Sequence, residues 1–182
     1  MDIENITRDF LESAATGDIE AFEQIYKAAS GFVYNSVVRI LLNEEDAREV
    51  TQEVFIKVYR SLGGFKYESS FKTWIYRISV NAALNYKKKM SLDAHKMTEY
   101  AVSKVTESEP GIGGNNEGVV IEMLSVLTPE QRACVVLREI QGLSYKEIAD
   151  VLNIDVNAVR SRLKRAREKL VEKLKVPSGV EK

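Results

Sequence analysis

Histidine, cysteine and tryptophan each occur once in the 182 residues of this sequence, and proline occurs three times. With one cysteine, Cys134, the chain cannot form an internal disulfide, and the apolar neighbours of Cys134 favour a small core residue over a nucleophile. With one histidine, His95, histidine-based catalysis is not expected. No Walker loop, metal-ligand cluster or nucleophile triad is visible in the sequence. We therefore predict no metal, no cofactor and no enzymatic activity.

Long apolar runs are missing as well. No run approaches the roughly 20 residues that a helix needs to cross a bilayer. Residues 1–10 are polar and acidic, unlike a signal peptide. These features predict a protein that stays in the cytoplasm without membrane insertion. The formal net charge of -1 neither favours nor excludes a nucleic-acid partner, because the charges are unevenly distributed along the chain.

Apolar residues recur at steps of three and four, and this spacing predicts an all-α fold of two small helical domains joined by a flexible linker. The first domain is expected to cover residues 1–89. In it, Asp18 is a good N-cap for a helix that we expect to end at Gly31. A later helix should stop at the pair Gly63 and Gly64, and a further helix should run from about Ser70 to the end of the domain.

Residues 90–118 break the helical pattern, because glycine, asparagine and one proline cluster there among scattered acids. We predict that this segment is the linker and that the second domain covers residues 119–182. Gly142 should end a helix within that domain. Two capping boxes mark helix starts in the same domain: Thr128 with Gln131, and Ser144 with Glu147.

The last two predicted helices are separated only by residues 153–155, which is the layout of a helix-turn-helix. The first should pack through Ile148, Ala149 and Leu152, and the second should bury a stripe of Val156, Val159, Leu163, Ala166, Leu170 and Leu174. The rest of the second helix carries Arg160, Arg162, Lys164, Arg165, Arg167, Lys169, Lys173 and Lys175. This basic face suits duplex DNA. A merely solvated face is the alternative for the charges taken alone, and many regulators share this motif.

The helix expected after residue 70 carries two stripes. Phe71, Ile75, Ile78 and Ala82 suit a core, and the neighbouring stripe consists of Trp74, Arg77, Asn81, Asn85 and Lys88. An aromatic ring beside amides and cations is the combination that stacks on an unpaired base and holds the nucleic-acid backbone. A core tryptophan is the alternative for Trp74.

Two segments resemble a known family. Residues 46–89, DAREVTQEVFIKVYRSLGGFKYESSFKTWIYRISVNAALNYKKK, look like region two of the extracytoplasmic-function (group IV) sigma factors of the sigma-70 family, with the sigma-E-like members nearest in pattern. Residues 127–170, LTPEQRACVVLREIQGLSYKEIADVLNIDVNAVRSRLKRAREKL, are similar to region four of the same group. The two matches occur in the family's order.

This resemblance implies a transcription initiation factor that binds core RNA polymerase through the largest-subunit clamp helices and the flap, and that recognises and melts promoter DNA without ATP. It also implies control by an anti-sigma factor and a role in stress response. The implied polymerase contacts are the exposed polar residues Asp46, Gln52, Glu53 and Lys57. The implied minus-ten contacts are the Trp74 stripe with Phe65, Lys66 and Tyr67 from the loop before it. The implied minus-thirty-five contacts are Asn157, Arg160, Ser161, Lys164 and Arg165.

One departure from the family pattern concerns the start of the recognition helix. Family members often have a proline and a glycine-threonine pair there, whereas this chain has Asp155, Asn157 and Ala158. Asp155 is a sound N-cap, but the change bears on how the helix docks at a phosphate. Two other classes of protein stay open. One is a helix-turn-helix repressor or activator that binds DNA by itself. The other is a nucleic-acid-processing enzyme, although the absence of clustered carboxylates near the basic helix argues against it.

Overall fold

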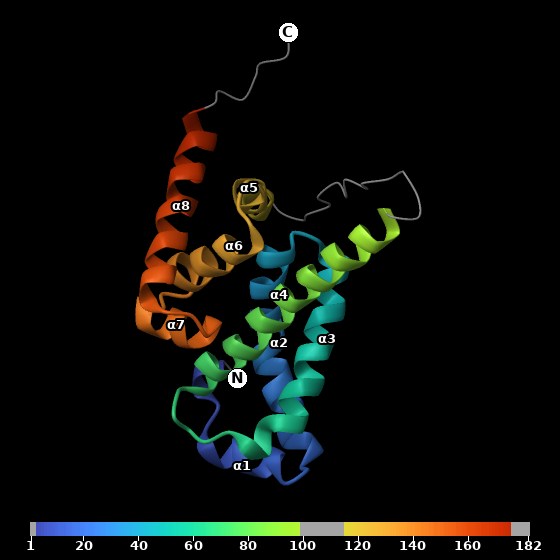
Figure 1. Cartoon of the computed structure of the whole chain (residues 1–182). Helices are drawn as coiled ribbons and strands as arrows, with labels where there is room; N and C mark the ends of the chain where they lie inside the picture. The colour runs from blue at the N-terminus through green and yellow to red at the C-terminus, as the bar shows by residue number, and fades with distance from the viewer. Residues whose placement is uncertain (1–2, 99–114, 176–182) are drawn as a thin grey trace. The chain divides into compact units, whose positions relative to one another are not determined.

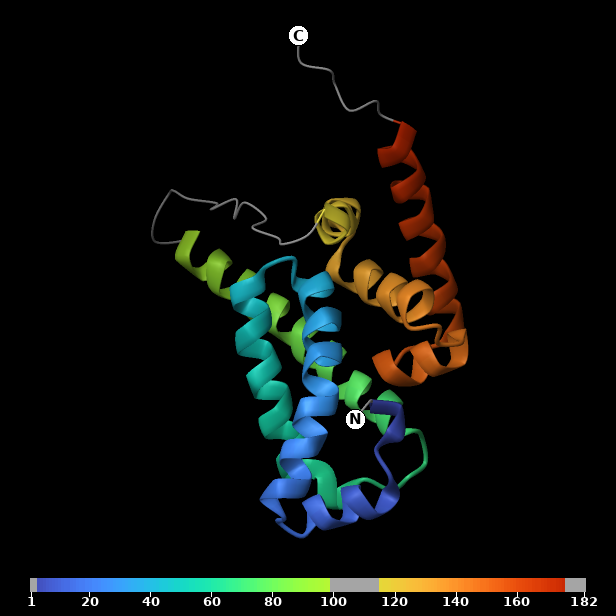
Figure 2. The same ribbon diagram turned by 180° about the vertical axis from the view of Figure 1, so that it is seen from behind.

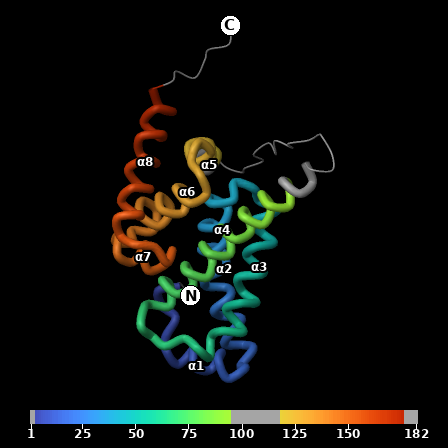
Figure 3. The backbone as a smooth tube through the Cα atoms, in the orientation of Figure 1, coloured from blue at the N-terminus to red at the C-terminus, as the bar shows by residue number. Residues whose placement is uncertain are grey.

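The computed structural model describes residues 3–98 and 115–175 of the chain. All regular elements within these residues are helical, which confirms the predicted all-α fold. The chain divides into two compact units, unit 1 (Met1–Glu107) and unit 2 (Ser108–Lys182). Figure 1 labels the helices, and Figure 3 traces the backbone of each unit.

Unit 1 is a bundle of three long helices with a short helix at one end. Its elements are η1 (Ile3–Asn5), α1 (Arg8–Ala15), α2 (Ile19–Leu41), α3 (Glu44–Ser61), η2 (Leu62–Gly64) and α4 (Phe71–Thr98). The three long helices α2, α3 and α4 each pack against the other two. Figure 2 shows α1 lying across the end of this bundle. Ile25, Val50 and Ile75 are fully buried where the three helices meet.

Side-chain caps determine where the long helices begin. Asp18 Oδ1 accepts a hydrogen bond of 3.0 Å from an amide in the first turn of α2, as predicted. Asn43 Oδ1 accepts one of 2.9 Å at the start of α3. Ser70 Oγ accepts one of 3.0 Å at the start of α4. Each cap satisfies a backbone donor that has no partner within its own helix.

Gly31 lies inside α2, and the prediction that it ends a helix is wrong. A glycine in a helix interior costs about 0.5–1 kcal/mol relative to alanine. The residues around it contribute more, because full burial of one valine is worth about 1.5–3 kcal/mol. Ala29 and Val33 are both fully buried in the bundle. Packing of α2 therefore outweighs the local preference of Gly31.

The two ends of unit 1 also differ from the sequence pattern. Helix α4 continues to Thr98, beyond the expected end at Lys89, so part of the expected linker is helical. Helix α1, of 8 residues, was not predicted. A helix this short is not stable in isolation. It forms here because Leu11 and Ala14 are buried against the rest of unit 1.

Unit 2 contains five helical elements in its described part. They are α5 (Asn115–Ser125), α6 (Pro129–Val135), the π-helical turn η3 (Val136–Ile140), α7 (Tyr145–Leu152) and α8 (Val156–Lys175). Both predicted capping boxes are present, at Thr128 and at Ser144. Gly142 follows η3 with φ 74°, a left-handed conformation that suits glycine, and the predicted helix end there is confirmed.

Helices α7 and α8 form the predicted helix-turn-helix, joined by residues 153–155. The predicted packing residues of α7 are buried, and so are Val159, Leu163 and Ala166 of α8. Val156 and Leu170 are only half-buried, and Leu174 is 70% exposed, so the placing of Leu174 in the buried stripe is wrong. Figures 1 and 2 show the reason, because the last turns of α8 extend past α6 and α7.

Candidate nucleic-acid interface

The first turn of α8 is fixed by Asp155. Its Oδ1 accepts hydrogen bonds from the amides of Asn157 at 2.8 Å and Ala158 at 2.9 Å. The predicted N-cap is therefore present, in the place where the family pattern has other residues. Asn153, with φ 52°, makes the tight turn between α7 and α8. Together these residues set the direction in which the recognition helix leaves the turn.

The predicted minus-thirty-five residues share the solvent face of α8. Helical steps of three and four place Asn157, Arg160, Ser161, Lys164 and Arg165 on one side, and all five are exposed. The buried residues of α8 lie on the opposite side. Arg160 Nη1 donates to Asn157 Oδ1 at 3.1 Å. The Lys164 ammonium lies 3.9 Å from Glu168, an exposed pair that contributes little and leaves the cation accessible.

Three cations of the predicted basic face have partners within unit 2 instead. Arg167 donates to Glu139 Oε1 at 2.8 Å, and this hydrogen bond raises the pKa of the guanidinium. Lys173 lies 3.3 Å from Glu122. Arg162 is half-buried against the Cys134 thiol. Among the described residues, the part of the basic face whose cations have no such partner is therefore narrower than the whole basic face of α8.

Cys134 is fully buried in the core of unit 2, as predicted. Burial raises the pKa of its thiol to about 11. A thiol of this kind is protonated and inaccessible at neutral pH, and a neutral thiol is a poor nucleophile.

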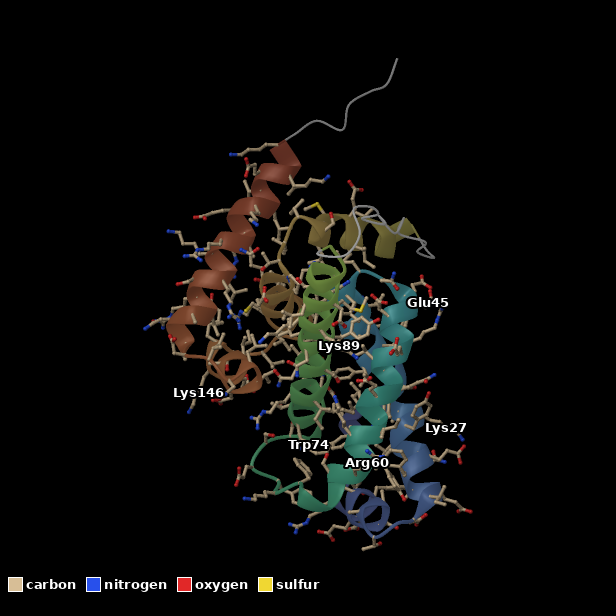
Figure 4. The ribbon with its side chains drawn as sticks, turned by 45° about the vertical axis from the view of Figure 1, so that its right-hand side comes forward. Lys27, Glu45, Arg60, Trp74, Lys89 and Lys146 are labelled. Carbon is tan, nitrogen blue, oxygen red and sulfur yellow. The ribbon has the colours of Figure 1, made fainter. Side chains whose placement is uncertain are left out.

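In unit 1, the Trp74 stripe lies on the side of α4 that faces away from the bundle. The buried side of α4 includes Ile75, Tyr76, Ser79, Val80 and Ala83. Arg77, Asn85 and Lys88 are exposed, while Trp74 and Asn81 are half-buried. Figure 4 shows Trp74 at the start of α4 and Lys89 farther along the same helix. Trp74 is thus neither a core residue nor a freely exposed ring.

The loop before α4 supports the tryptophan through a cluster of aromatic rings. The Phe65 ring centroid lies 5.1 Å from that of Trp74 and 4.6 Å from that of Tyr67. Phe71 lies 5.8 Å from Trp74. Phe65 itself is 8% exposed, whereas Tyr67 is 38% exposed and Lys66 is exposed. The burial of Phe65 gives it a packing role beneath the two accessible rings.

The residues implied to contact polymerase do not all share one environment. Gln52, Glu53 and Lys57 are exposed on α3. Asp46 is half-buried, and its Oδ1 accepts a hydrogen bond of 2.9 Å from the Tyr86 hydroxyl of α4. The prediction that Asp46 is an exposed residue is wrong, because this contact with α4 covers it.

The Tyr86 hydroxyl reports the same contact. Burial and then the hydrogen bond to Asp46 raise the pKa of Tyr86 to about 12. Lys87 places its ammonium 3.6 Å from Asp46 Oδ2. Asp46 therefore joins the first turn of α3 to α4.

An aromatic ladder between α2 and α3 was missed by the sequence reasoning. Phe22 packs edge-on against Tyr59 with centroids 4.9 Å apart, and Tyr26 packs in the same way against Phe55 at 4.7 Å. Tyr26, Tyr59 and Ile56 are about half exposed. The sequence does indicate these aromatic contacts, because α2 and α3 each carry two aromatic residues four positions apart, on one face of the helix.

Residues 3–98 and 115–175 contain no group of histidine, cysteine, aspartate and glutamate that could hold a metal ion. In that same part of the chain, each helix is too short or too polar to span a bilayer. Unit 2 contains a helix-turn-helix whose second helix, α8, has an exposed basic face. This arrangement is typical of nucleic-acid-binding proteins.

Comparison with known proteins identifies the family. A model of sigma-70 region 2 matches residues 25–91, and a model of sigma-70 region 4 matches residues 118–170. The RNA polymerase sigma-H factor of Pseudomonas aeruginosa is 32% identical over 173 residues, which cover 88% of this chain and 90% of that protein. The ECF RNA polymerase sigma-E factor of Escherichia coli K12 is 33% identical over 176 residues, covering 90% and 92%.

Solved structures agree with this result. CnrH in complex with the cytosolic domain of CnrY has a TM-score of 0.68 and 25% identity, and the match covers 96% of this chain and all of CnrH. The sigma factor RpoE of Bartonella quintana, solved with the anti-sigma factor NepR, has a TM-score of 0.69 and 21% identity over 87% of this chain and 99% of RpoE, and shows a shared fold. The chain belongs to the extracytoplasmic-function sigma factors of the sigma-70 family. It is a transcription initiation factor that binds core RNA polymerase and directs it to promoters.

Proposed function

We propose that the two units bind one promoter in two different forms. Unit 1 captures the minus-ten element as an extruded single strand, and unit 2 reads the minus-thirty-five element as a duplex. The observation that carries this division is the half-exposed Trp74 ring on the outer side of α4, in line with exposed cations and amides. The exposed basic face of α8 supports the second half of the proposal.

Strand capture in unit 1 follows from stacking. One base on an aromatic ring gains about 1–3 kcal/mol, and extruding a base costs a few kcal/mol. Several contacts together can therefore offset the cost without ATP or a catalytic group. The proposed contacts are Lys66, Tyr67, Trp74, Arg77, Asn81, Asn85 and Lys88. Phe65 supports the rings of Tyr67 and Trp74 from beneath.

Duplex recognition in unit 2 rests on the solvent face of α8. Arg160 and Arg165 can each bind a guanine edge with two hydrogen bonds, an interaction worth about 1–3 kcal/mol of discrimination. Lys164, Ser161 and Asn157 complete the proposed contact set, through bases or phosphates. Asp155 places a carboxylate at the start of the same helix, where it orders the first turn.

For the polymerase contact we propose Gln52, Glu53 and Lys57 on α3, directed at the clamp helices of the largest subunit. Asp46 contributes indirectly, by holding α3 against α4 through Tyr86. The flap is the proposed partner of unit 2. Each contact is weak by itself, and linking them in one assembly provides the affinity.

The regulation and the location that we propose for this chain are based on its family. CnrH was solved with CnrY, and RpoE was solved with an anti-sigma factor. An anti-sigma factor that covers the polymerase and promoter surfaces is the proposed regulator of this chain, in response to stress. The proposed site of action is the cytoplasm, where polymerase and promoters meet. The chain itself catalyses no reaction.

Permanganate footprinting of the minus-ten thymines tests strand capture. Holoenzyme with the natural chain should expose these thymines, and Trp74→Ala should reduce their reactivity by at least tenfold at equal occupancy of core polymerase, whereas Trp74→Phe should retain part of it. Undiminished melting by Trp74→Ala would refute the assignment. For α8, Arg165→Ala should weaken binding of minus-thirty-five duplex by about 1–3 kcal/mol. Lys173→Ala is the matched control on the same helix, because Lys173 pairs with Glu122.

A further inference from the structure

The N-terminal segment of unit 1 contacts both the loop before α4 and the first turn of α4, although these parts lie far apart in the sequence. Glu4 of η1 forms an ion pair of 2.8 Å with Lys72 in the first turn of α4. Arg8 of α1 places its guanidinium carbon 4.6 Å from the centroid of the Tyr67 ring. Ile3 and Leu11 are buried. The segment is thus fastened to the bundle on both sides of these contacts.

Arg8 also forms an ion pair within α1. Its Nε donates to Glu12 Oε1 at 2.7 Å, one helical turn away. The guanidinium lies over the Tyr67 ring at a distance typical of a cation–π interaction. Tyr67 packs against Phe65, and Phe65 packs against Trp74. A continuous line of contacts joins α1 to the tryptophan.

The backbone of Tyr67 has an unfavourable conformation that contacts of its side chain can stabilise. Its φ is 58°, in the left-handed region that a bulky residue rarely adopts. A strained conformation of this kind persists only where the surroundings hold it. The ring is 38% exposed, so burial alone does not hold it. Among the described residues, Phe65 makes a ring contact and Arg8 a cation contact with the Tyr67 ring.

The Glu4–Lys72 ion pair and the Arg8–Tyr67 contact border a cleft of about 500 Å³. One wall comes from Glu4 and Arg8, and the other from Tyr67, Ser70 and Lys72. The cleft lies beside the loop that contacts the minus-ten strand in the proposed function. Movement of the N-terminal segment would change the position of that loop. The reason is that Arg8 contacts Tyr67 in the loop, and Glu4 contacts Lys72 directly after it.

We propose that Arg8 is a positioning residue for strand capture, which holds Tyr67 and, through Phe65, Trp74 in the geometry that receives the single strand. This inference rests on the proposed function of unit 1. Arg8 acts through Tyr67 and not by binding the strand itself. Glu4 is the second fastening of the same segment, through Lys72.

The test uses holoenzyme of core polymerase with the full chain, and a fluorescent single-stranded oligonucleotide of the non-template minus-ten sequence. Arg8→Ala should weaken oligonucleotide binding about two- to fivefold, the range expected for one exposed cation–π contact. Core affinity should not change, and Arg8→Lys should restore part of the loss. In a Tyr67→Ala background, Arg8→Ala should have no further effect. Arg48→Ala is the matched control, because Arg48 forms a similar ion pair of 2.8 Å with Glu44.

The control lies at the opposite end of α3 from the loop. Glu45, close to Arg48 in the sequence, and Trp74 are labelled far apart along the bundle in Figure 4. Arg48→Ala should leave oligonucleotide binding unchanged. An equal loss from Arg8→Ala with and without the Tyr67 ring would overturn the proposal, since it would indicate direct contact with a phosphate. No loss at all from Arg8→Ala would overturn it too.

A second measurement on the free chain separates this inference from the proposed function. Trp74 is the single tryptophan of the chain, so its fluorescence reports the loop without labelling. Arg8→Ala should increase acrylamide quenching of Trp74, whereas Arg48→Ala should not. If the natural holoenzyme fails to bind the oligonucleotide, the proposed function fails, and the quenching result still decides the role of Arg8. Unchanged quenching in Arg8→Ala would contradict the positioning role.

Discussion

Replacing Asp155 with alanine should loosen the start of the recognition helix without removing any base-reading side chain. Asp155 Oδ1 accepts two amide hydrogen bonds, of 2.8 and 2.9 Å, from the first turn of α8. Alanine leaves both donors without an acceptor, whereas asparagine keeps an acceptor oxygen at the same position. Asp155→Ala and Asp155→Asn therefore differ in the cap and share the loss of a negative charge.

The expected size of the effect follows from the cap. Loss of an N-cap side chain costs about 0.5–2 kcal/mol, and asparagine ranks with aspartate as a cap. Asp155→Ala should therefore destabilise unit 2 by about 1 kcal/mol, and Asp155→Asn by less than half of that. A difference of 1 kcal/mol changes a local opening equilibrium about fivefold. The Asn157 and Ala158 amides should show this change most strongly.

Two measurements detect the change. Amide hydrogen exchange at residues 156–160 measures local opening of α8. Urea unfolding followed by far-UV circular dichroism contains the transitions of both helical units, and the transition that Trp74 fluorescence does not follow belongs to unit 2. Trp74 fluorescence, which reports unit 1, should give the same midpoint in all three proteins. If Asp155→Asn lost as much protection as Asp155→Ala, the cap would not be what orders the helix.

Removal of the negative charge of Asp155 should increase the affinity for DNA, whereas loss of the cap lowers stability. The Asp155 carboxylate lies at the end of α8 that approaches the phosphate backbone in the proposed docking. Asp155→Asn should therefore bind minus-thirty-five duplex more tightly than the natural chain, with the gain shrinking as salt rises. Weaker binding by Asp155→Asn would contradict this placement of the helix start.

The other predictions concern the cores of the two units. Gly31→Ala should stabilise unit 1 by about 0.5–1 kcal/mol, because the added methyl group meets no atom within 4 Å; a lower urea midpoint of Trp74 fluorescence would argue against that. Within the described residues the Tyr76 hydroxyl is buried without a hydrogen-bond partner, so Tyr76→Phe should be neutral or stabilising by up to about 1 kcal/mol, and a loss above 1 kcal/mol would show that the hydroxyl is bonded. Burial raises the pKa of Cys134 to about 11 from an ordinary value of 9.0, so its contribution to stability is complete below pH 9 and is lost as the pH rises to about 11. Over that range, unit 2 of the natural chain should lose about 2–3 kcal/mol more than Cys134→Ala, as read from urea midpoints; parallel pH profiles would disprove the shift.

Features encoded within a few residues were predictable from the sequence. The capping boxes at Thr128 and Ser144, the cap at Asp155 and the helix end at Gly142 each depend on local hydrogen bonds or on one backbone angle. The periodic spacing on α8 likewise identified the buried residues Val159, Leu163 and Ala166 in the part of the helix that packs within unit 2. Such features can be predicted because the residues that form them are neighbours in the sequence.

Features that depend on tertiary packing could not be read in the same way. Gly31 has a helix-breaking preference, and only the burial of its neighbours overrides it. Helix α1 exists because Leu11 and Ala14 find a surface in unit 1. Asp46 looked exposed on its own helix, but its partner Tyr86 lies 40 residues away in the sequence. The cation–π contact of Arg8 with Tyr67 is equally long-range and was not foreseen.

Dependence on core polymerase tests the central claim most directly. Fluorescence anisotropy with a labelled promoter fragment would compare the free chain, core polymerase and the two together, with Trp74→Ala and Arg165→Ala as separate variants. The account predicts weak, unspecific binding by the free chain and a specific, melted complex only when core polymerase is present, with each variant defective at its own promoter element. Tight, sequence-specific binding by the free chain, or no association with core polymerase, would contradict it.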